Sequence, residues 1–337
     1  MAGNRFKGVI PTRLSRMTQL KDALYGQSNR LDGVVGAAFA DGGRAPLKVL
    51  DLSYNLLTAL NPFRNWNLTE QIILSHNSIQ QTMPSHFLVD DAVAHGTRAK
   101  HLDLSFNQIG GTLEPLSTLT ALTSLDLTGN QLTGGVPTWV SKLTRLQRLH
   151  LGENQLGGAV PVELFAGSSL QHVDVSSNSL SGALPDLARC PAVLNLSNNA
   201  LEGALPATMG TACQSTLTEL DLSRNKFTGD IPTPLTRIRF LHRLNLSRNA
   251  FSGTIPICFD ARRALRDLDL SYNLLEGWIP RDLGTHLAFK SVALGGNQLF
   301  GQIHYLLKNF PVASFRPDNW QLCDPPLPAC APEVIMI

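Results

Sequence analysis

The sequence predicts an α/β solenoid, in which short parallel strands stack on one side and short helical turns return the chain on the other. Three observations lead to this prediction. The segment LDLSRNKFTGDIP, which begins at Leu220, returns 24 residues later as LNLSRNAFSGTIP and again 24 residues after that as LDLSYNLLEGWIP. An asparagine, a glycine and a proline recur at fixed places in these copies. A period of about 20 to 30 residues with regularly spaced leucines is typical of units that stack into a solenoid.

The asparagine column extends over almost the whole chain and gives about thirteen repeats. Glycine stands four residues after the asparagine in all but two copies, and proline stands seven residues after it in ten copies. Three residue types do not align in this way by chance, so we take the repeat as the organising unit of the chain. The asparagines are Asn4, Asn29, Asn55, Asn77, Asn107, Asn130, Asn154, Asn178, Asn199, Asn225, Asn249, Asn273 and Asn297.

Each column has a physical role. The leucines five and three residues before the asparagine, such as Leu125 and Leu127, alternate with the period of a strand and point inward. The asparagine amide donates and accepts at once, so stacked asparagines can satisfy buried backbone groups of neighbouring turns. The Ile-Pro segment predicts a second short extended piece. The residues after it, such as 138–147, predict a short helix or 3₁₀ turn on the convex side.

Composition excludes several classes of function. A hydrophobic content of 43% supplies a continuous core, and a net charge of +2 gives no general attraction to nucleic acid or anionic membranes. No apolar run is long enough for a membrane helix, and the first residues lack the apolar segment of a signal peptide. The glycines follow the repeat and form no phosphate-binding loop. We therefore expect no enzyme, no cofactor and no metal, and we interpret the aspartates four before the asparagine as a solvated face.

The chain is expected to form a solenoid over 1–309, with its N-terminal cap absent or truncated, a C-terminal cap over 310–330 and a tail over 331–337. Cys323 and Cys330 lie in a proline-rich loop after the last repeat, and we expect a disulfide between them that closes this loop. Cys190 and Cys213 are about one repeat apart. They could be joined, but buried thiols are the favoured interpretation.

The consensus L-x-L-S-x-N-x-L-x-G-x-I-P resembles the plant-specific class of extracellular leucine-rich repeats, from about residue 4 to 309. The ending SFRPDNWQLCDPPLPAC, residues 314–330, is similar to the C-terminal cap of plant receptor-like proteins and receptor kinases. The family usually carries a signal peptide and an N-terminal cap with paired cysteines, and this sequence shows neither.

The resemblance implies a leucine-rich repeat superhelix with a concave parallel β-sheet. It also implies an extracellular or cell-surface recognition ectodomain, associated with the plasma membrane if a membrane helix lies outside this chain. The expected partners are a peptide or protein ligand and, as a further candidate, a co-receptor. Nucleic acid is not an expected partner.

Three glycosylation sequons fit a secreted chain, at Asn67, Asn195 and Asn245. The alternative is that the last two arise because LNLS is itself the repeat motif. A glycan on Asn245 would stand on the concave face.

Variation on the concave face is the most informative feature for function. We expect the residues seven, six, four, two and one before each asparagine to point outward. Arg224 and Arg248 share one column in adjacent copies and could together grip a carboxylate or sulfate. The alternative is that these arginines pair with neighbouring carboxylates as an ordinary solvated face. The candidate ligand-binding residues are Glu219, Arg224, His242, Arg243, Arg248, Arg266 and Tyr272, with a weaker cluster at Arg148 and His150.

These observations favour a non-catalytic scaffold that binds a peptide or protein ligand on its concave face. One alternative is a secreted inhibitor of a polysaccharide-degrading enzyme, which would use the same face. A second is a structural or ice-binding repeat, which regular outward threonine rows would favour. The column two before the asparagine is mainly serine, with Thr128 as an exception, so this alternative is less favoured.

Overall fold

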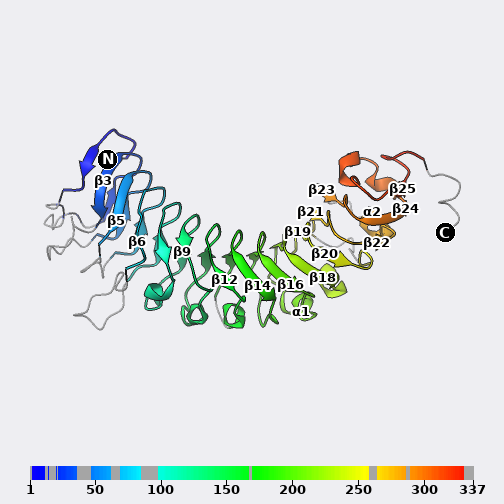
Figure 1. The fold of residues 1–337 in the computed structure, drawn as a ribbon, viewed down its shortest axis with the longest axis horizontal. Helices are drawn as coiled ribbons and strands as arrows, with labels where there is room; N and C mark the ends of the chain where they lie inside the picture. The colour runs from blue at the N-terminus through cyan, green and yellow to red at the C-terminus, as the bar shows by residue number, and fades with distance from the viewer. Residues whose placement is uncertain are drawn as a thin grey trace. The chain divides into compact units, whose positions relative to one another are not determined.

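The computed structural model describes residues 2–11, 14, 20, 22–35, 47–61, 69–84, 98–166, 169–257, 264–285 and 289–329. The chain divides into two compact units, Met1–Ser179 and Leu180–Ile337. Within each unit, short strands follow one another as successive turns of a coil (Figure 1). This is the predicted parallel-strand solenoid with few helices.

The main sheet of each unit consists of three-residue parallel strands, and each has its middle residue buried. In the first unit they are β2 (Ala23–Tyr25), β4 (Val49–Asp51), β6 (Gln71–Ile73), β7 (His101–Asp103), β9 (Ser124–Asp126), β11 (Arg148–His150) and β13 (His172–Asp174). In the second unit they are β15 (Val193–Asn195), β17 (Glu219–Asp221), β19 (Arg243–Asn245), β21 (Asp267–Asp269) and β23 (Ser291–Ala293). We keep the name concave face for the surface that the first and third residues of these strands form.

A second set of strands begins directly after most of the asparagines. In the first unit they are β1 (Lys7–Val9), β3 (Arg30–Val35), β5 (Leu56–Leu60), β8 (Gly110–Gly111), β10 (Gln131–Leu132) and β12 (Gly157–Gly158), and β14 (Ser179–Ala183) starts at the unit boundary. The second unit adds β16 (Ala200–Gly203), β18 (Lys226–Asp230), β20 (Ala250–Ser252), β22 (Glu276–Gly277), β24 (Gln298–Gln302) and β25 (Gln321–Cys323).

These second strands correct the sequence prediction, which placed the extended piece at Ile-Pro. The strand β18, for example, ends one residue before Ile231 and Pro232. The N–H groups just after each asparagine bond to the preceding turn, as Gln131 does to the Ile109 carbonyl at 2.9 Å. Proline has no N–H group to continue such a ladder, so the strand ends before it.

Short helical turns follow the proline, as predicted. Residues 138–147 contain the 3₁₀ turn η4 (Thr138–Lys142). The others are η3 (Glu114–Leu116), η5 (Val162–Phe165), α1 (Met209–Ala212), η6 (Thr233–Arg237), α2 (Arg281–Thr285), η7 (Tyr305–Leu307) and η8 (Val312–Ser314). None of the helices that the structure describes has the length and apolar character needed to cross a membrane.

The asparagines form the predicted hydrogen-bonded ladder inside each unit. The Asn225 side-chain amide donates to the carbonyls of Leu222 at 3.1 Å and of Leu196, one turn earlier, at 3.0 Å. Its oxygen accepts from the Leu201 N–H group at 3.0 Å. One asparagine thus fixes two consecutive turns, because buried backbone groups left without partners would be costly.

The ladder continues past the last asparagine that the sequence pattern identified. Asn319 is 2% exposed, and its oxygen accepts from the Leu299 N–H group at 2.8 Å. Its amide donates to the Leu294 carbonyl at 2.9 Å. The segment 310–330 therefore contains a further ladder residue, with Pro326 seven residues after it, although Ser314, Arg316 and Cys323 stand in place of the two leucines and the glycine of the repeat. The boundaries at 309 and 330 stay predictions.

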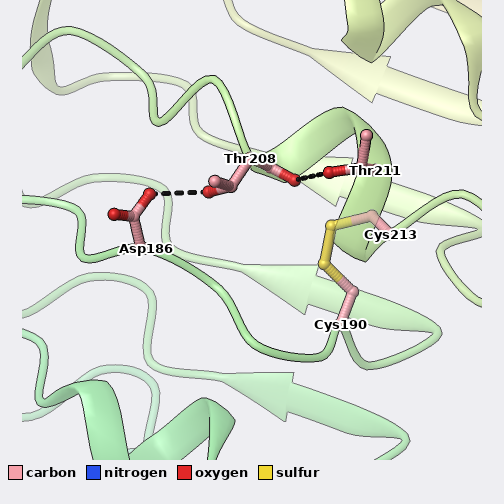
Figure 2. The surroundings of a disulfide bond; sticks show 5 residues. All are labelled: Asp186, Cys190, Thr208, Thr211 and Cys213. Atoms are coloured by element: carbon pink, nitrogen blue, oxygen red, sulfur yellow. Dashed lines mark hydrogen bonds between the residues drawn. A yellow bond between two sulfur atoms is a disulfide. The ribbon is translucent and has the colours of Figure 1, made fainter.

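A disulfide joins Cys190 to Cys213, which ends helix α1 in the second unit (Figure 2). The expectation of two buried thiols was therefore wrong. A spacing of one repeat places the two residues on neighbouring turns, with their Cα atoms 4.8 Å apart. Thr208 donates to Asp186 at 2.6 Å between the same two turns. Cys330 lies outside the described residues, so its pairing with Cys323 stays a prediction.

Candidate ligand-binding face

Three columns of side chains run across the strands of the concave face. The register of the main sheet aligns the first residues of all strands in one column and the third residues in another. The third column, which we call the turn column, consists of the residues just before the asparagines. Turn-column residues have positive φ angles, for example 55° at Arg224, so each turns the chain sharply out of its strand.

The third-position column is bonded to the scaffold. The Asp221 carboxylate accepts hydrogen bonds from the Ser223 N–H group at 2.9 Å and hydroxyl at 2.6 Å. The same pair of hydrogen bonds, which we call the serine clasp, joins Asp103 to Ser105 and Asp269 to Ser271. Ser223 is only 6% exposed. The serine two before the asparagine thus bonds to the carboxylate of the concave face, and this bond occupies its hydroxyl.

Asparagine replaces aspartate at two of these third positions. The Asn245 oxygen accepts from the Ser247 N–H group at 3.1 Å and hydroxyl at 2.8 Å, and its amide donates to Asp221 at 3.1 Å. Asn195 accepts from Ser197 in the same way. Both sequon asparagines therefore accept the hydrogen bonds of the serine two residues later, so LNLS has a structural role with or without a glycan. Asn67 lies outside the described residues.

The first-position column of the second unit carries alternating charges. Glu219, Arg243 and Asp267 stand in register on adjacent strands, followed by Ser291. None of the three charged side chains forms an ion pair with another described residue. Arg243, Asp267 and Ser291 line a hollow of about 320 Å³ together with Leu244, Asn245, Leu268 and Asp269. The parallel register of β17, β19, β21 and β23 places one first-position residue on each successive turn, and this brings the side chains together.

A basic column precedes these strands. His242 and Arg266 were singled out in the sequence, and the Arg266 N–H group bonds to the His242 carbonyl at 2.8 Å. Lys290 continues the column one turn further, because its N–H group bonds to the Arg266 carbonyl at 2.7 Å. The sequence analysis missed Lys290, although it lies seven residues before Asn297 and the column rule would have found it.

The turn column of the second unit places Arg224, Arg248 and Tyr272 on successive turns. The Arg248 guanidinium lies over the Tyr272 ring, 4.3 Å from the ring centre. That ring in turn covers Gly296, where a Cβ atom would come within 2.8 Å of it. Arg224 and Arg248 are thus neighbours as predicted, but Arg248 has Tyr272 as an intramolecular partner.

In the first unit, the weaker cluster forms a charged pair. His150 Nδ1 lies 3.4 Å from the Asp126 carboxylate on the adjacent strand. This hydrogen bond raises the pKa of His150 against the opposing effect of burial. Burial alone would raise the pKa of Asp126, but the hydrogen bonds from His150 and Thr128 lower it. Arg148 is exposed and lies beside His172 in the first-position column.

A row of aromatic rings occupies the turn column of the first unit, and the sequence analysis did not single it out. The rings of Tyr54 and His76 are stacked 4.2 Å apart, and those of His76 and Phe106 are 4.5 Å apart. The Phe106 ring ends the row over Gly129. The signal was available, because these residues stand one before their asparagines.

No metal centre is found in the part of the chain that the structure describes, since no three His, Cys, Asp or Glu side chains there are grouped as ligands. The charged residues of the concave face instead form extended columns. Such columns suit the binding of a long, polar partner across several strands.

Comparison with known proteins identifies the repeats. A family model described as leucine-rich repeat matches residues 120–180 and 215–276, and a model of two leucine-rich repeat copies matches 100–137. Comparison with curated protein sequences gave no significant match.

Solved structures give further relatives. A plant peptide hormone receptor, RGFR1 in complex with RGF2, is 29% identical with a TM-score of 0.79, over 90% of this chain and 48% of that chain. A TDR receptor is 29% identical with a TM-score of 0.80, over 91% and 52%. A plant ice-binding protein is 27% identical with a TM-score of 0.66, over 77% and 82%. This chain thus spans about half the length of the two receptor chains. Leucine-rich repeats thus occupy residues 100–180 and 215–276, and the structural neighbours of the chain include a plant peptide hormone receptor.

Proposed function

We propose that the chain is a non-catalytic recognition scaffold, a cell-surface or secreted receptor-like ectodomain or part of one. It binds a peptide or protein ligand on the concave face of the second unit. The observation that supports this proposal most directly is the row of Glu219, Arg243 and Asp267, which carries alternating charges without ion pairs among the described residues.

The charge order favours a particular kind of ligand. An extended peptide that crosses the strands would meet a negative, a positive and a negative side chain in turn. A ligand carboxylate opposite Arg243, flanked by basic groups opposite Glu219 and Asp267, would pair with all three. Hydrogen bonds between charged partners are stronger than neutral ones, and the arginine fork can bind a carboxylate through two of them. His242 and Arg266 border this row and would extend the contact.

The solved relatives support a ligand of this class. RGFR1 was solved in complex with RGF2. A HAESA ectodomain, 25% identical with a TM-score of 0.65, was solved with an IDA peptide hormone ligand that is extended at its N-terminus by further residues. A co-receptor is a further proposed partner of this chain. Glycosylation at Asn67, Asn195 and Asn245 is likewise a proposal.

Selection from a display library of random linear peptides tests the proposed function. The affinity of a selected peptide is then measured for Arg243→Ala and Asp267→Ala. We expect each variant to lose at least about tenfold in affinity, because a charge-assisted hydrogen bond is removed. Lys226→Ala is the matched control, since Lys226 is an exposed charge on β18, outside the concave face. A selected peptide that binds both variants as tightly as the unmodified protein would contradict the site.

The alternatives receive less support. The column three residues after the asparagines is no regular threonine row of the kind an ice-binding surface would favour. It reads Lys7, Asp32, Thr58, Gln80, Gly110, Thr133, Gly157, Ser181, Glu202, Thr228, Ser252, Glu276 and Phe300. An inhibitor of a polysaccharide-degrading enzyme would use the concave face as well. Loss of a hydrolase's activity on mixing with this protein would distinguish that function.

A further inference from the structure

The two units carry equivalent aromatic side chains that differ in one neighbour. In the second unit, Tyr272 has its ring covered by Arg248 from the turn before. In the first unit, Tyr54 heads the aromatic row, and the residue of the turn before is Ser28. Both tyrosines stand in the turn column, with φ angles of 55° at Tyr54 and 56° at Tyr272.

Backbone geometry shows that Ser28 is related to Tyr54 as Arg248 is to Tyr272. Ser28 has a φ angle of 57° and donates its N–H group to the Ser53 carbonyl at 2.9 Å. Arg248 has a φ angle of 55° and donates to the Ser271 carbonyl, also at 2.9 Å. In each case the acceptor directly precedes the tyrosine.

The ring of Tyr54 is therefore backed by His76 on one side, and no ring or cation from the described residues covers the other. His76 stacks on it at 4.2 Å and an interplanar angle of 12°. No cation lies over Tyr54 from any residue that the structure describes. The serine at position 28 is too short to cover a ring. Tyr54 is accordingly 56% exposed, compared with 42% for Tyr272.

A carboxylate lies on the same turn as this ring, at the end of the strand that leads to it. Asp51 ends strand β4, three residues before Tyr54. One carboxylate oxygen holds the Ser53 N–H group at 3.1 Å and hydroxyl at 2.7 Å. The other oxygen makes no hydrogen bond or ion pair with a described residue. Tyr25 is half exposed and lies in register with Asp51 on the neighbouring strand.

We propose that Tyr54, Ser28 and Asp51 form a binding site for an arginine side chain of a basic peptide or protein segment. The planar guanidinium stacks on the negative face of the Tyr54 ring, where Arg248 lies on Tyr272. Asp51, three residues before Tyr54 on the same turn, attracts the guanidinium as an exposed counter-charge. The site lies in the first unit and does not depend on the proposed function of the second.

The test uses the full chain labelled with 3-fluorotyrosine. The chain has four tyrosines and therefore gives four fluorine signals. The signals are assigned by replacing Tyr25, Tyr54, Tyr272 and Tyr305 with phenylalanine one at a time. The probe is N-acetyl-arginine amide, and the citrulline analogue at matched ionic strength is the neutral control. We expect a saturable shift of the Tyr54 signal with a Kd on the order of 0.1 M, since one stacked cation and one exposed ion pair contribute little. The Tyr272 signal stays in place.

Three variants sharpen the test. Ser28→Arg supplies the missing cover and should abolish the response of Tyr54. Asp51→Asn keeps the serine clasp, as Asn245 does, and should weaken probe binding by about threefold. Arg248→Ser uncovers Tyr272 and should make its signal respond to the probe.

The proposal is overturned by any of three results. The Tyr54 signal stays in place with the arginine probe while Tyr272 in the Arg248→Ser variant responds. The citrulline analogue shifts the Tyr54 signal as strongly as the arginine probe does. The response of Tyr54 survives unchanged in Ser28→Arg.

Discussion

The first-position and third-position columns of the concave face lie two residues apart on the same strands, yet they behave differently. Asp221, at a third position, holds Ser223 and Asn245 through three hydrogen bonds. Glu219, at the first position of the same strand, has no ion pair with Arg243 beside it. The third position is therefore largely occupied by the scaffold, and the first position is available to a ligand. A charge on this face is informative about function only once its column is known.

The largest expected difference is between two aspartates of these columns. Asp221→Ala should lower the free energy of unfolding by about 2 kcal/mol, because it leaves the buried Ser223 hydroxyl without an acceptor. Asp267→Ala should change it by less than about 0.5 kcal/mol, since its side chain is bonded to nothing described. Urea unfolding followed by two spectroscopic probes measures both values. Equal losses in the two variants would show that the column does not decide the role.

The turn column gives an intermediate case. Gly296→Ala should cost about 1 to 2 kcal/mol, because its φ angle is 73° and the new methyl group would meet the Tyr272 ring. Gly158 has a φ angle of 78° with nothing within 4 Å of a Cβ atom, so Gly158→Ala carries the backbone strain alone. Thermal unfolding of both variants isolates the contribution of the ring. A loss no greater in Gly296→Ala than in Gly158→Ala would mean that the ring moves aside freely.

The smallest expected effect tests the pair of His150 and Asp126, two third-position residues on adjacent strands of the first unit. The pKa of His150 is raised and that of Asp126 is lowered, so the pair stabilises the fold when both groups are charged. The contribution of Asp126 is lost as the pH falls below about 4, and that of His150 is lost as the pH rises through its raised pKa, above about 6.5. His150→Gln should therefore lower the free energy of unfolding by about 0.5 kcal/mol near pH 5, because both side chains are partly exposed and solvent screens the pair.

The difference in unfolding free energy between His150→Gln and the unmodified protein should be measured at several pH values. This also separates the effect of His150 from that of His101. Burial, with Arg148 and Lys100, lowers the pKa of His101. Acid therefore weakens the fold through His101 in both proteins, and this effect cancels in the difference. A difference between the two proteins that is the same at pH 5 and pH 8 would contradict the charged pair.

The repeat made most of the fold predictable, because leucine, asparagine and proline each act through local geometry. Leu220 and Leu222 are buried, and Asn225 bonds across two turns as its amide chemistry required. The orientation of Ser223 was not predictable from period alone, since it depends on a bond to Asp221 two residues earlier. Asn319 was missed because Ser314 and Arg316 stand in place of the two leucines before it, and Cys323 stands in place of the glycine after it.

The candidate site was less predictable than the fold. The columns correctly placed Glu219 and Arg243 side by side, because register follows from the repeat. Whether two such neighbours pair depends on side-chain conformation, which a single sequence does not specify. The stack of Tyr54 on His76 escaped notice for a related reason. The period of the repeat aligns the two residues in one column, but it does not show whether their rings stack.

The asparagine ladder also bears on how such a chain can change length over generations. Asn225 bonds the turn before it by two contacts, one through its oxygen and one through its amide, and bonds its own turn by a third, and Asn249 and Asn273 repeat this pattern. Duplication or loss of one whole repeat therefore recreates every bond at the new junction, whereas a shift of one residue breaks the ladder. The disulfide marks an exception, because Cys190 and Cys213 must stay on adjacent turns. Insertion of a repeat between them would separate the sulfurs, so gene duplication is constrained there and free elsewhere along the ladder.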